Sequence, residues 1–252
     1  FRNEMIEKIY HKLVSIIKKI QYYYSVNWTK TLYFNFKKFP FSVAKKLPVY
    51  FYGSVKFSSI KGNIEINAPI KSGMIGFGQS YEIFTVSKKT AEIFLQGKII
   101  FNGHVQFGKD YFVYVANNAV LQMGNMSSLG SNGKIICFER ITLGDYARIG
   151  FESQLSDTNA HQMINTLTDE KYPLTGIISI GNYNYISNRV TIFSNTKTSN
   201  YITIASNSLC TDDYTDFGEN ILIGGIPAKI LKKDISRDWN GEIESLKKYL
   251  II

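Results

Sequence analysis

Aliphatic residues recur at every sixth position along much of this chain. The step is clearest at Leu143, Ile149 and Leu155, and again at Ile180, Ile186, Ile192, Thr198, Ile204 and Cys210. A helix repeats at about 3.6 residues and a strand at about 2, so neither element alone explains the pattern. A six-residue step predicts a chain wound into a triangular parallel coil, with one short strand on each face. The same step places His161, rather than an aliphatic residue, six positions after Leu155.

The coil is predicted over residues 55–233. Each turn would comprise roughly 18 residues, stack at about 4.8 Å on the next turn and bury one aliphatic side chain per face. Glycine, asparagine and aspartate fill the positions between, and these residues suit corners because they tolerate positive φ. Residues 162–176 lose the step, so we expect a loop that leaves the coil there.

Both ends of the chain are predicted to be helical. Residues 1–54 are basic and aromatic, and residues 4–24 carry an apolar stripe at heptad spacing. This first helix would pack on its own domain or on a neighbouring subunit, or lie on an anionic membrane surface. Residues 234–252 predict a C-terminal helix whose apolar face comprises Trp239, Ile243, Leu246 and Leu250.

The charge balance favours an anionic partner. The chain has 29 Lys and Arg against 20 Asp and Glu, a net charge of +9. Nucleic acid, an acidic membrane, an acidic polymer or a phosphate-bearing cofactor would each fit this charge. Basic and aromatic residues alternate over 25–52, as on single-strand-binding surfaces, but no nucleic-acid fold signature accompanies them. We therefore expect no nucleic-acid partner.

Compartment and cysteine chemistry are predicted to be unremarkable. No apolar run is long enough to span a bilayer and no signal peptide is visible. The expected location is cytoplasmic, at the inner face of the membrane if residues 4–24 bind it. Cys137 and Cys210 match no metal-site spacing and are expected to be small buried hydrophobes.

Three segments of the predicted coil resemble a known family. Residues 180–192 (IGNYNYISNRVTI) look like the repeat of the hexapeptide-repeat acyltransferases, and residues 223–232 (IGGIPAKILK) are similar to the segment that closes those domains. Residues 156–161 (SDTNAH) resemble the segment that carries the catalytic histidine in members that acetylate sugars and polysaccharides. The resemblance implies an all-β core with a left-handed parallel β-helix, acetyl-CoA as co-substrate, and a homotrimer with active sites between subunits.

The chemistry of acetyl transfer needs one base. Acetyl-CoA is already an activated thioester, so one imidazole can take the proton of an acceptor hydroxyl and return a proton to the departing thiolate. His161 is the predicted base. Asp157 or Asn159 would orient its ring through the other nitrogen, with a corner turn as their alternative role and a backbone carbonyl as an alternative partner. Asn159 stands where many relatives carry Asp.

The resemblance also implies where the co-substrate binds. The expected contacts are Ser187, Ala205 and Ser206 to pantetheine, and Lys229, Lys232 and Lys233 to the CoA phosphates. The alternatives are small corner residues and a solvated basic tail. Residues 210–216 are acidic where relatives often carry a lysine, which weakens the phosphate assignment. A zinc site would need three clustered histidines, and His161 is the only convincing coil histidine, so no metal is expected.

The first functional hypothesis is an acetyl-CoA-dependent O-acetyltransferase. Its acceptor would be a carbohydrate, a sugar of a bacterial capsule or lipopolysaccharide. An N-acetyltransferase of a nucleotide-linked amino sugar would use the same base and the same co-substrate. A third hypothesis is a non-catalytic β-helical assembly module, because the repeat alone specifies a fold rather than a reaction.

Overall fold

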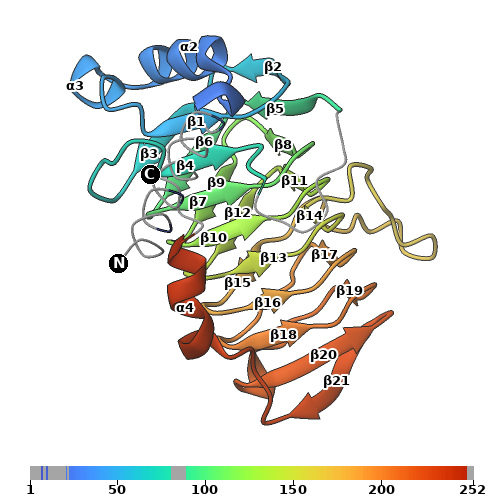
Figure 1. The fold of residues 1–252 in the computed structure, drawn as a ribbon. Helices are drawn as coiled ribbons and strands as arrows, with labels where there is room; N and C mark the ends of the chain where they lie inside the picture. Colours follow the sequence, from blue (N-terminus) through green and yellow to red (C-terminus); the bar gives the residue numbers. More distant parts are fainter. Residues whose placement is uncertain (1–6, 8–9, 11–20, 22, 81–88, 249–252) are drawn as a thin grey trace.

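The computed structural model describes residues 7, 10, 21, 23–80 and 89–248 of the chain. These residues wind into a parallel coil whose three faces are sheets of short strands (Figure 1). The nine-stranded sheet holds β1 (Val49–Phe51), β4 (Ile75–Phe77), β7 (Val105–Phe107), β10 (Ser127–Leu129), β13 (Arg148–Ile149), β16 (Tyr185–Ile186), β18 (Ile202–Ile204), β20 (Ile221–Gly225) and β21 (Ala228–Lys233). The seven-stranded sheet holds β2 (Val55–Ile60), β5 (Ala91–Leu95), β8 (Phe112–Val115), β11 (Lys134–Cys137), β14 (Gln154–Ser156), β17 (Thr191–Phe193) and β19 (Leu209–Cys210). The five-stranded sheet holds β3 (Asn63–Ile66), β6 (Lys98–Phe101), β9 (Val120–Met123), β12 (Arg140–Leu143) and β15 (Ile178–Ile180).

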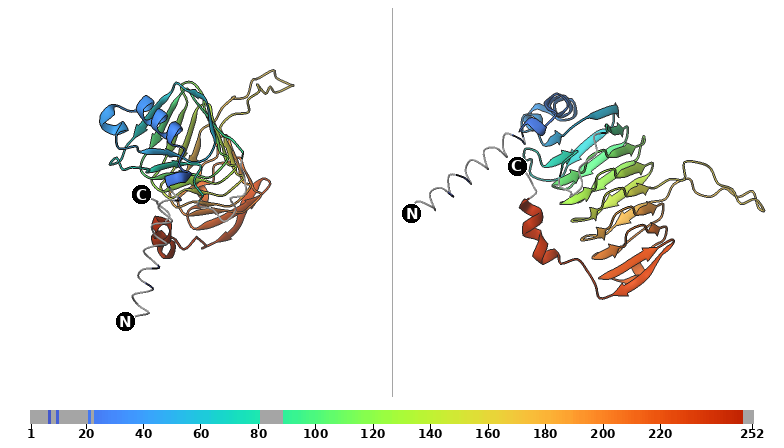
Figure 2. Two further views of the ribbon diagram at one scale, coloured as in Figure 1. Left: turned by 45° about the horizontal axis from the view of Figure 1, so that its top comes forward. Right: turned by 45° about the vertical axis from the view of Figure 1, so that its right-hand side comes forward.

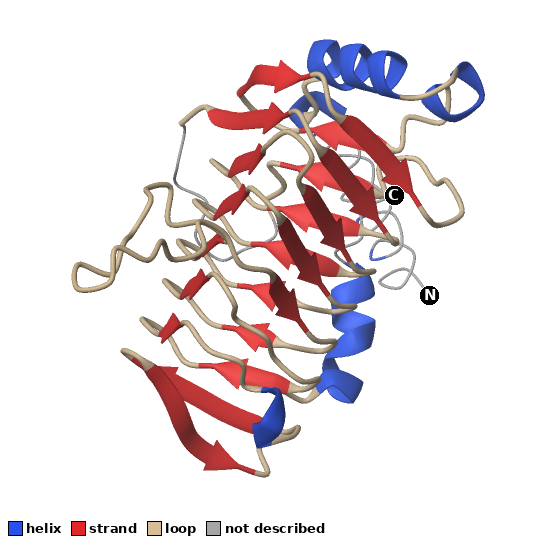
Figure 3. Cartoon of the chain, turned by 180° about the vertical axis from the view of Figure 1, so that it is seen from behind, coloured by secondary structure: helices blue, strands red, loops and turns tan. Residues whose placement is uncertain are grey.

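The coil has three edges, which are named here by the order in which the chain crosses them. Each turn visits the nine-, then the seven-, then the five-stranded sheet. The first edge joins the nine- to the seven-stranded sheet, the second edge joins the seven- to the five-stranded sheet, and the third edge leads back to the nine-stranded sheet. Figure 3 shows the strands stacked turn upon turn from behind.

Strand register explains the six-residue step. In the nine-stranded sheet, Ile149, Ile186, Ile204 and Ile223 are direct parallel neighbours on successive turns. Each of these side chains is at most 3% exposed. The aliphatic positions therefore form columns inside the coil, and the predicted parallel β-helix is confirmed.

The coil begins earlier than residue 55. Val49–Phe51 pair in parallel with Ile75–Phe77 and so form the first strand of the nine-stranded sheet. No six-residue repeat precedes this short strand in the sequence, so the spacing of aliphatic residues could not predict it.

Two helices cover the first turn. They are α2 (Trp28–Lys38) and α3 (Phe41–Ala44), and they lie over one end of the stack of strands (Figures 1 and 3). Phe34 of α2 is 1% exposed, and its ring centroid lies 5.0 Å from that of Phe51. The Asn35 amide donates to the Val49 carbonyl at 2.7 Å and accepts from the Val49 N–H at 3.2 Å. The helix thus pairs a strand edge that would otherwise be free to bind another chain.

The other end of the coil is closed by a reversal of direction. β21 pairs antiparallel with β20, and the described chain adds no further turn after it. A short 3-10 helix, η1 (Thr215–Phe217), precedes β20. The last described element, after β21, is α4 (Trp239–Lys248). The C-terminal helix predicted from residue 234 therefore begins five residues later, and Leu250 lies outside the described residues.

The predicted amphipathic helix over residues 4–24 lies almost wholly outside the described residues. Its contact with a membrane stays a prediction. Among the helices that are described, none has both the length and the hydropathy of a bilayer-spanning segment.

Candidate active site

Residues 157–177 leave the coil at the second edge and form an excursion. It connects β14 to β15 and projects well beyond the sheets (Figures 1 and 2). Its two arms are tied at the base by bridges between Thr158 and Thr175, and further out between Ile164 and Lys171. The excursion therefore begins before His161, whereas the loss of the six-residue step predicted a start after it, at residue 162.

The base of the excursion is tightly bonded. The Gly176 N–H donates to the Asp157 carbonyl at 2.9 Å, and the Asn159 N–H donates to the Leu174 carbonyl at 3.0 Å. A Cβ at Gly176 would lie 2.2 Å from the Asn195 side-chain oxygen, so any other residue there would displace the Asn195 side chain. The outgoing and returning strands are thus held together where they meet the coil.

His161 lies just beyond this base and is exposed. Ala160, immediately before it, takes φ +58°, and its N–H donates to the Thr158 hydroxyl at 3.0 Å. The His161 N–H donates to the Asn159 carbonyl at 2.6 Å. Successive tight turns therefore present the imidazole to the outside, and the expectation that it occupies an aliphatic step of the coil is wrong. The residue that stands in the next sheet is Ile178, seventeen positions further on, because the excursion intervenes.

Asp157 is used differently from the orienting role considered for it. Its side chain is fully buried, and its two oxygens accept from the N–H groups of Phe138, at 2.7 Å, and Glu139, at 2.9 Å. Burial raises the pKa of Asp157, while these two backbone donors act in the opposite direction. Its carboxylate closes the corner of the preceding turn, which is the alternative role weighed for it.

Asn159 remains adjacent to His161 through the backbone. It is half-buried, and its carbonyl accepts the His161 N–H. Among the described residues no hydrogen bond involves the side-chain amide of Asn159 or the imidazole ring of His161. The structure therefore brings Asn159 and His161 together in one turn and directs Asp157 elsewhere.

The three residues predicted to contact pantetheine lie together at the first edge. The Ser187 and Ser206 hydroxyls are 2.7 Å apart on neighbouring turns. The Ala205 N–H donates to the Ile223 carbonyl at 2.9 Å, and a Cβ added at Gly224 would lie 2.7 Å from the Ala205 methyl group. These contacts describe a corner with small side chains and paired hydroxyls.

Lys229 and Lys232 are exposed on the closing hairpin. Lys229 pairs with Gly224, which places its backbone next to the Ala205 corner. Lys229 also lines a cavity of about 620 Å³ with Asp212 and Asp213. Hydrogen bonds from the Thr215 hydroxyl and Lys197 lower the pKa of Asp213 to about 2, so this carboxylate is ionised at neutral pH. A phosphate approaching Lys229 from that side would meet negative charge.

His161 and the serine corner occupy different edges of one molecule. The excursion follows β14 at the second edge, whereas Ser187 precedes β17 at the first edge. The width of the seven-stranded sheet separates them. A single copy therefore presents the two parts of the predicted site apart from each other.

Two columns of stacked aromatic side chains were not predicted from the sequence. Phe94, Tyr114 and Phe138 stack along the outside of the seven-stranded sheet, with centroid separations of 4.4 Å and 5.2 Å, and lead to the base of the excursion. Tyr146, Tyr183 and Tyr201 form a second column at the third edge. The signal for the second column was available, since each tyrosine stands three positions before an aliphatic step residue.

Both cysteines are buried and unpaired, as expected of small hydrophobes. Burial raises the pKa of Cys210 to about 12, which keeps it a thiol at neutral pH. Within the described residues, no three His, Cys, Asp or Glu side chains lie close enough together to hold a metal ion.

Comparison with known proteins finds distant structural likeness. No protein-family model matches the chain, and no curated protein matches its sequence. The polySia-specific acetyltransferase NeuO is similar in structure, with 15% identity, a TM-score of 0.49 and coverage of 80% of this chain and 86% of NeuO. The polysialic acid O-acetyltransferase OatWY gives 18% identity, a TM-score of 0.45 and coverage of 75% and 76%. AntD, an N-acyltransferase from Bacillus cereus solved with dTDP and 3-hydroxybutyryl-CoA, gives 12% identity, a TM-score of 0.44 and coverage of 84% of this chain and 96% of AntD.

These likenesses do not carry the functional assignment, because all three TM-scores lie below 0.5. The fold is established by the strand pairing of the chain itself. The chain is a parallel β-helix that extrudes one histidine-bearing excursion at its second edge and lines its first edge with small hydroxyl side chains.

Proposed function

We propose that the protein is an acetyl-CoA-dependent O-acetyltransferase that acts on a hydroxyl group of a carbohydrate, a sugar of a bacterial capsule or lipopolysaccharide. The observation that carries the proposal is His161, an exposed imidazole held by tight turns at the bonded base of the excursion. It lies within the segment that resembles the catalytic segment of sugar acetyltransferases. A structural histidine in a β-helix corner would instead be packed or hydrogen-bonded.

The reaction requires only His161 as a reacting side chain. The imidazole takes the proton of the acceptor hydroxyl while the oxygen bonds to the thioester carbonyl carbon. The carbon–sulfur bond then breaks, and the imidazolium gives the proton to the departing thiolate. Asn159 holds the backbone of this turn through its carbonyl, so it is a positioning residue for His161.

The aromatic column at the base of the excursion supports a carbohydrate acceptor. Phe138 is 38% exposed, and Asp157 fixes its backbone at the corner. The C–H face of a sugar ring packs favourably against the face of an aromatic ring, because one surface is weakly positive and the other is negative. An acceptor lying on Phe138 would have a hydroxyl group near the edge that carries His161.

Pantetheine is proposed to lie in the first-edge corner of Ser187, Ala205 and Ser206. If so, Ser206→Tyr should weaken CoA binding at least tenfold, because the exposed ring would fill the corner that pantetheine occupies. Isothermal titration with CoA measures the change. Ser72→Tyr makes the same substitution at an exposed corner of the third edge and is the matched control. Equal CoA affinity in both variants would place the cofactor elsewhere.

The separation of the two edges favours a homotrimer. In such an assembly the second edge of one copy would face the first edge of the next, and His161 would meet the serine corner across the interface. The excursion has the surface of an intersubunit arm. It exposes Met163, Ile164, Leu167, Tyr172 and Leu174, and Leu167 at its tip is 94% exposed.

Leu167→Asp is expected to weaken self-association at least tenfold. Burying a leucine side chain contributes about 1.5–3 kcal/mol, and a charge in its place adds a desolvation cost. Light scattering over a dilution series gives the oligomer mass. Thr168→Asp places the same charge one residue away and should leave the mass unchanged. A leucine variant that assembles like the threonine variant would show that the arm has no role in assembly.

One assay separates the three functional hypotheses. The protein is incubated with acetyl-CoA and with candidate glycans or nucleotide-linked amino sugars, and free CoA thiol is measured. NMR of the product distinguishes an O-acetyl ester from an N-acetyl amide. An ester supports the proposal, whereas an amide selects the N-acetyltransferase. Absence of CoA binding by titration would favour the non-catalytic assembly module.

The basic N-terminal region is proposed to bring the enzyme to the inner face of the membrane, where lipid-linked glycans are assembled. Sedimentation with anionic vesicles, compared between the full chain and a chain lacking residues 1–24, tests this. Equal sedimentation of the two would remove the proposal.

A further inference from the structure

The tyrosine column at the third edge ends abruptly. Tyr146, Tyr183 and Tyr201 occupy the same corner position on successive turns, with φ between +53° and +56°. Their rings stack with centroids 5.0 Å apart and interplanar angles of 8° and 3°. The equivalent position on the next turn is Asn220, since it precedes β20 as Tyr201 precedes β18, and its φ is +55°. The last ring of the column therefore faces an asparagine rather than a fourth ring.

The segment before α4 forms a second wall beside this column. The Trp239 indole meets Tyr146 and Tyr183 edge-on, at interplanar angles of 73° and 69°. The Arg237 guanidinium lies 4.9 Å from the Trp239 ring and pairs with Glu242. These contacts hold the wall in place against the column.

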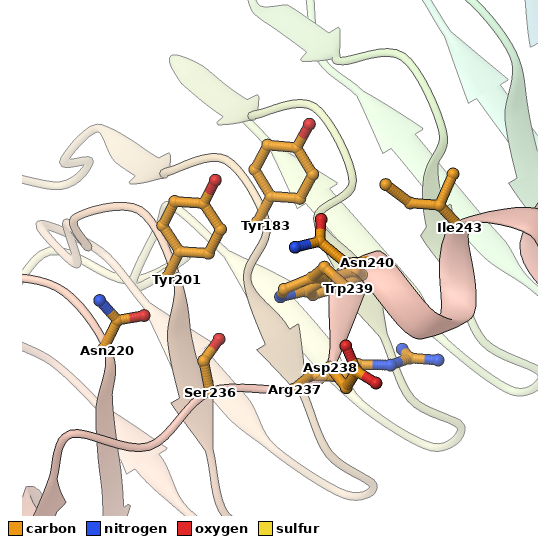
Figure 4. Close-up of a pocket in the computed structure, with 9 residues that line it drawn as sticks. All are labelled: Tyr183, Tyr201, Asn220, Ser236, Arg237, Asp238, Trp239, Asn240 and Ile243. Atoms are coloured by element: carbon orange, nitrogen blue, oxygen red, sulfur yellow. The ribbon is translucent and has the colours of Figure 1, made fainter.

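A cavity of about 250 Å³ lies between the two walls (Figure 4). Its lining includes Tyr201, Asn220, Ser236, Asp238 and Trp239. In the close-up, the Ser236 hydroxyl and the indole nitrogen of Trp239 both face the space between the Tyr201 ring and the Trp239 ring.

Two buried polar atoms of this lining lack a partner. The Ser236 hydroxyl and the Trp239 indole N–H make no hydrogen bond with any described residue. The Trp239 side chain is only 5% exposed. A buried donor left unpaired costs roughly 1–3 kcal/mol, and such groups in native proteins usually await a ligand or an ordered water. Two of them on one cavity wall indicate a polar occupant.

We propose that this cavity, the tyrosine-column pocket, binds a single sugar ring. An aromatic face is available at Tyr201 for the C–H face of the sugar. The polar lining combines a donor-only group at Trp239, an acceptor-only carboxylate at Asp238, and groups of both kinds at Ser236 and Asn220. Sugar hydroxyls both donate and accept, so one ring can satisfy this mixed set.

The geometry disfavours a nucleobase at the same place. Stacking a flat base between two rings needs parallel faces, whereas Trp239 stands nearly perpendicular to the tyrosines. The cavity volume of about 250 Å³ is also below the roughly 300 Å³ at which pockets for drug-sized ligands begin, which favours a single sugar ring.

The pocket is separate from the proposed catalytic edge. The third edge and the second edge flank the five-stranded sheet, so a glycan lying across that sheet could reach both. The sugar in the pocket would be a unit of the acceptor other than the one that is acetylated. This assignment of the ligand to the acceptor rests on the proposed function, whereas the binding of a sugar ring does not.

Binding is tested by saturation-transfer NMR with glucose, galactose and N-acetylglucosamine as separate probes. Transfer to ring protons of at least one sugar is expected with the unaltered protein. Asn220→Tyr should reduce it severalfold, because a fourth tyrosine would continue the column into the pocket at a φ that the other three already adopt. The melting temperature of this variant should be unchanged or raised, which separates loss of binding from loss of fold.

Two further variants complete the test. Ser236→Ala should weaken sugar binding severalfold by removing one polar partner, whereas Tyr33→Ala, at the far end of the coil, should have no effect. Absence of transfer from all three sugars to the unaltered protein, or equal transfer in Asn220→Tyr, would overturn the proposal. His161→Ala should bind the sugars normally. If acetyl transfer is never found but this binding pattern holds, the pocket stands and the catalytic proposal fails.

Discussion

Replacing His161 by alanine is expected to lower kcat for acetyl transfer by about 10²–10⁴-fold, the usual contribution of a positioned general base. The affinity for CoA should change little, because the base acts on the proton of the acceptor hydroxyl, whereas pantetheine is proposed to contact the serine corner. Stability should also be retained, since the side chain is exposed and no described residue bonds to its ring. The measurements are CoA release, titration with CoA and thermal unfolding.

The control for this variant is Gln162→Ala. Gln162 is the next residue, and its amide donates to the Tyr172 carbonyl at 2.7 Å within the excursion. Its loss tests whether any disturbance of the arm reduces activity. Turnover within about threefold of the unaltered enzyme in His161→Ala would exclude His161 as the base. An equal loss in both variants would assign the effect to the shape of the excursion.

Asp157→Ala is expected to destabilise the fold by about 2–4 kcal/mol. The substitution leaves the N–H groups of Phe138 and Glu139 without an acceptor, and each unsatisfied donor costs roughly 1–3 kcal/mol. Asp157→Asn keeps one acceptor oxygen and should lose less stability. Urea unfolding of the three proteins measures the differences.

The same pair of variants decides the catalytic role of Asp157. If the carboxylate only closes a corner, folded Asp157→Asn should retain kcat within about tenfold. If it orients the imidazole, as the aspartate of a Ser-His-Asp triad does, kcat should fall by about 10⁴-fold with little change in stability. The hydrogen bonds of the corner favour the first outcome.

The coil could be predicted from sequence because its repeat reports a packing requirement. Ile186, Ile192 and Ile204 each fill one face of a turn and are fully buried, so the columns are filled mainly by aliphatic side chains. The position of His161 could not be predicted in the same way. Counting by six assumes that the chain stays in the coil, and it leaves the coil after Ser156. The count therefore singled out His161 for the wrong structural reason, and its role as the base stays a prediction.

The hydrogen-bond donors to the Asp157 carboxylate also could not be predicted from the sequence. Its acceptor role depends on the N–H groups of residues 138 and 139, which the coil brings next to it from one turn earlier. Local sequence shows a turn-forming residue but not the turn that it closes. The serine corner, by contrast, could be anticipated, because Ser187 and Ala205 directly follow the aliphatic step residues Ile186 and Ile204, which pair on adjacent turns, and Ser206 is the next residue.

The bonded base of the excursion also bears on how such proteins diversify. Because the Gly176 N–H meets the Asp157 carbonyl, the two ends of the arm are as close as the ends of an ordinary corner. The coil beneath is continuous whether the arm has five residues or thirty, and lengthening a closed loop adds only a slowly growing entropic cost. Residues 162–174 could therefore be exchanged for another arm, in evolution or by protein engineering, without changes to the sequence of the coil. An arm of different length or sequence would then be obtained by graft rather than by redesign.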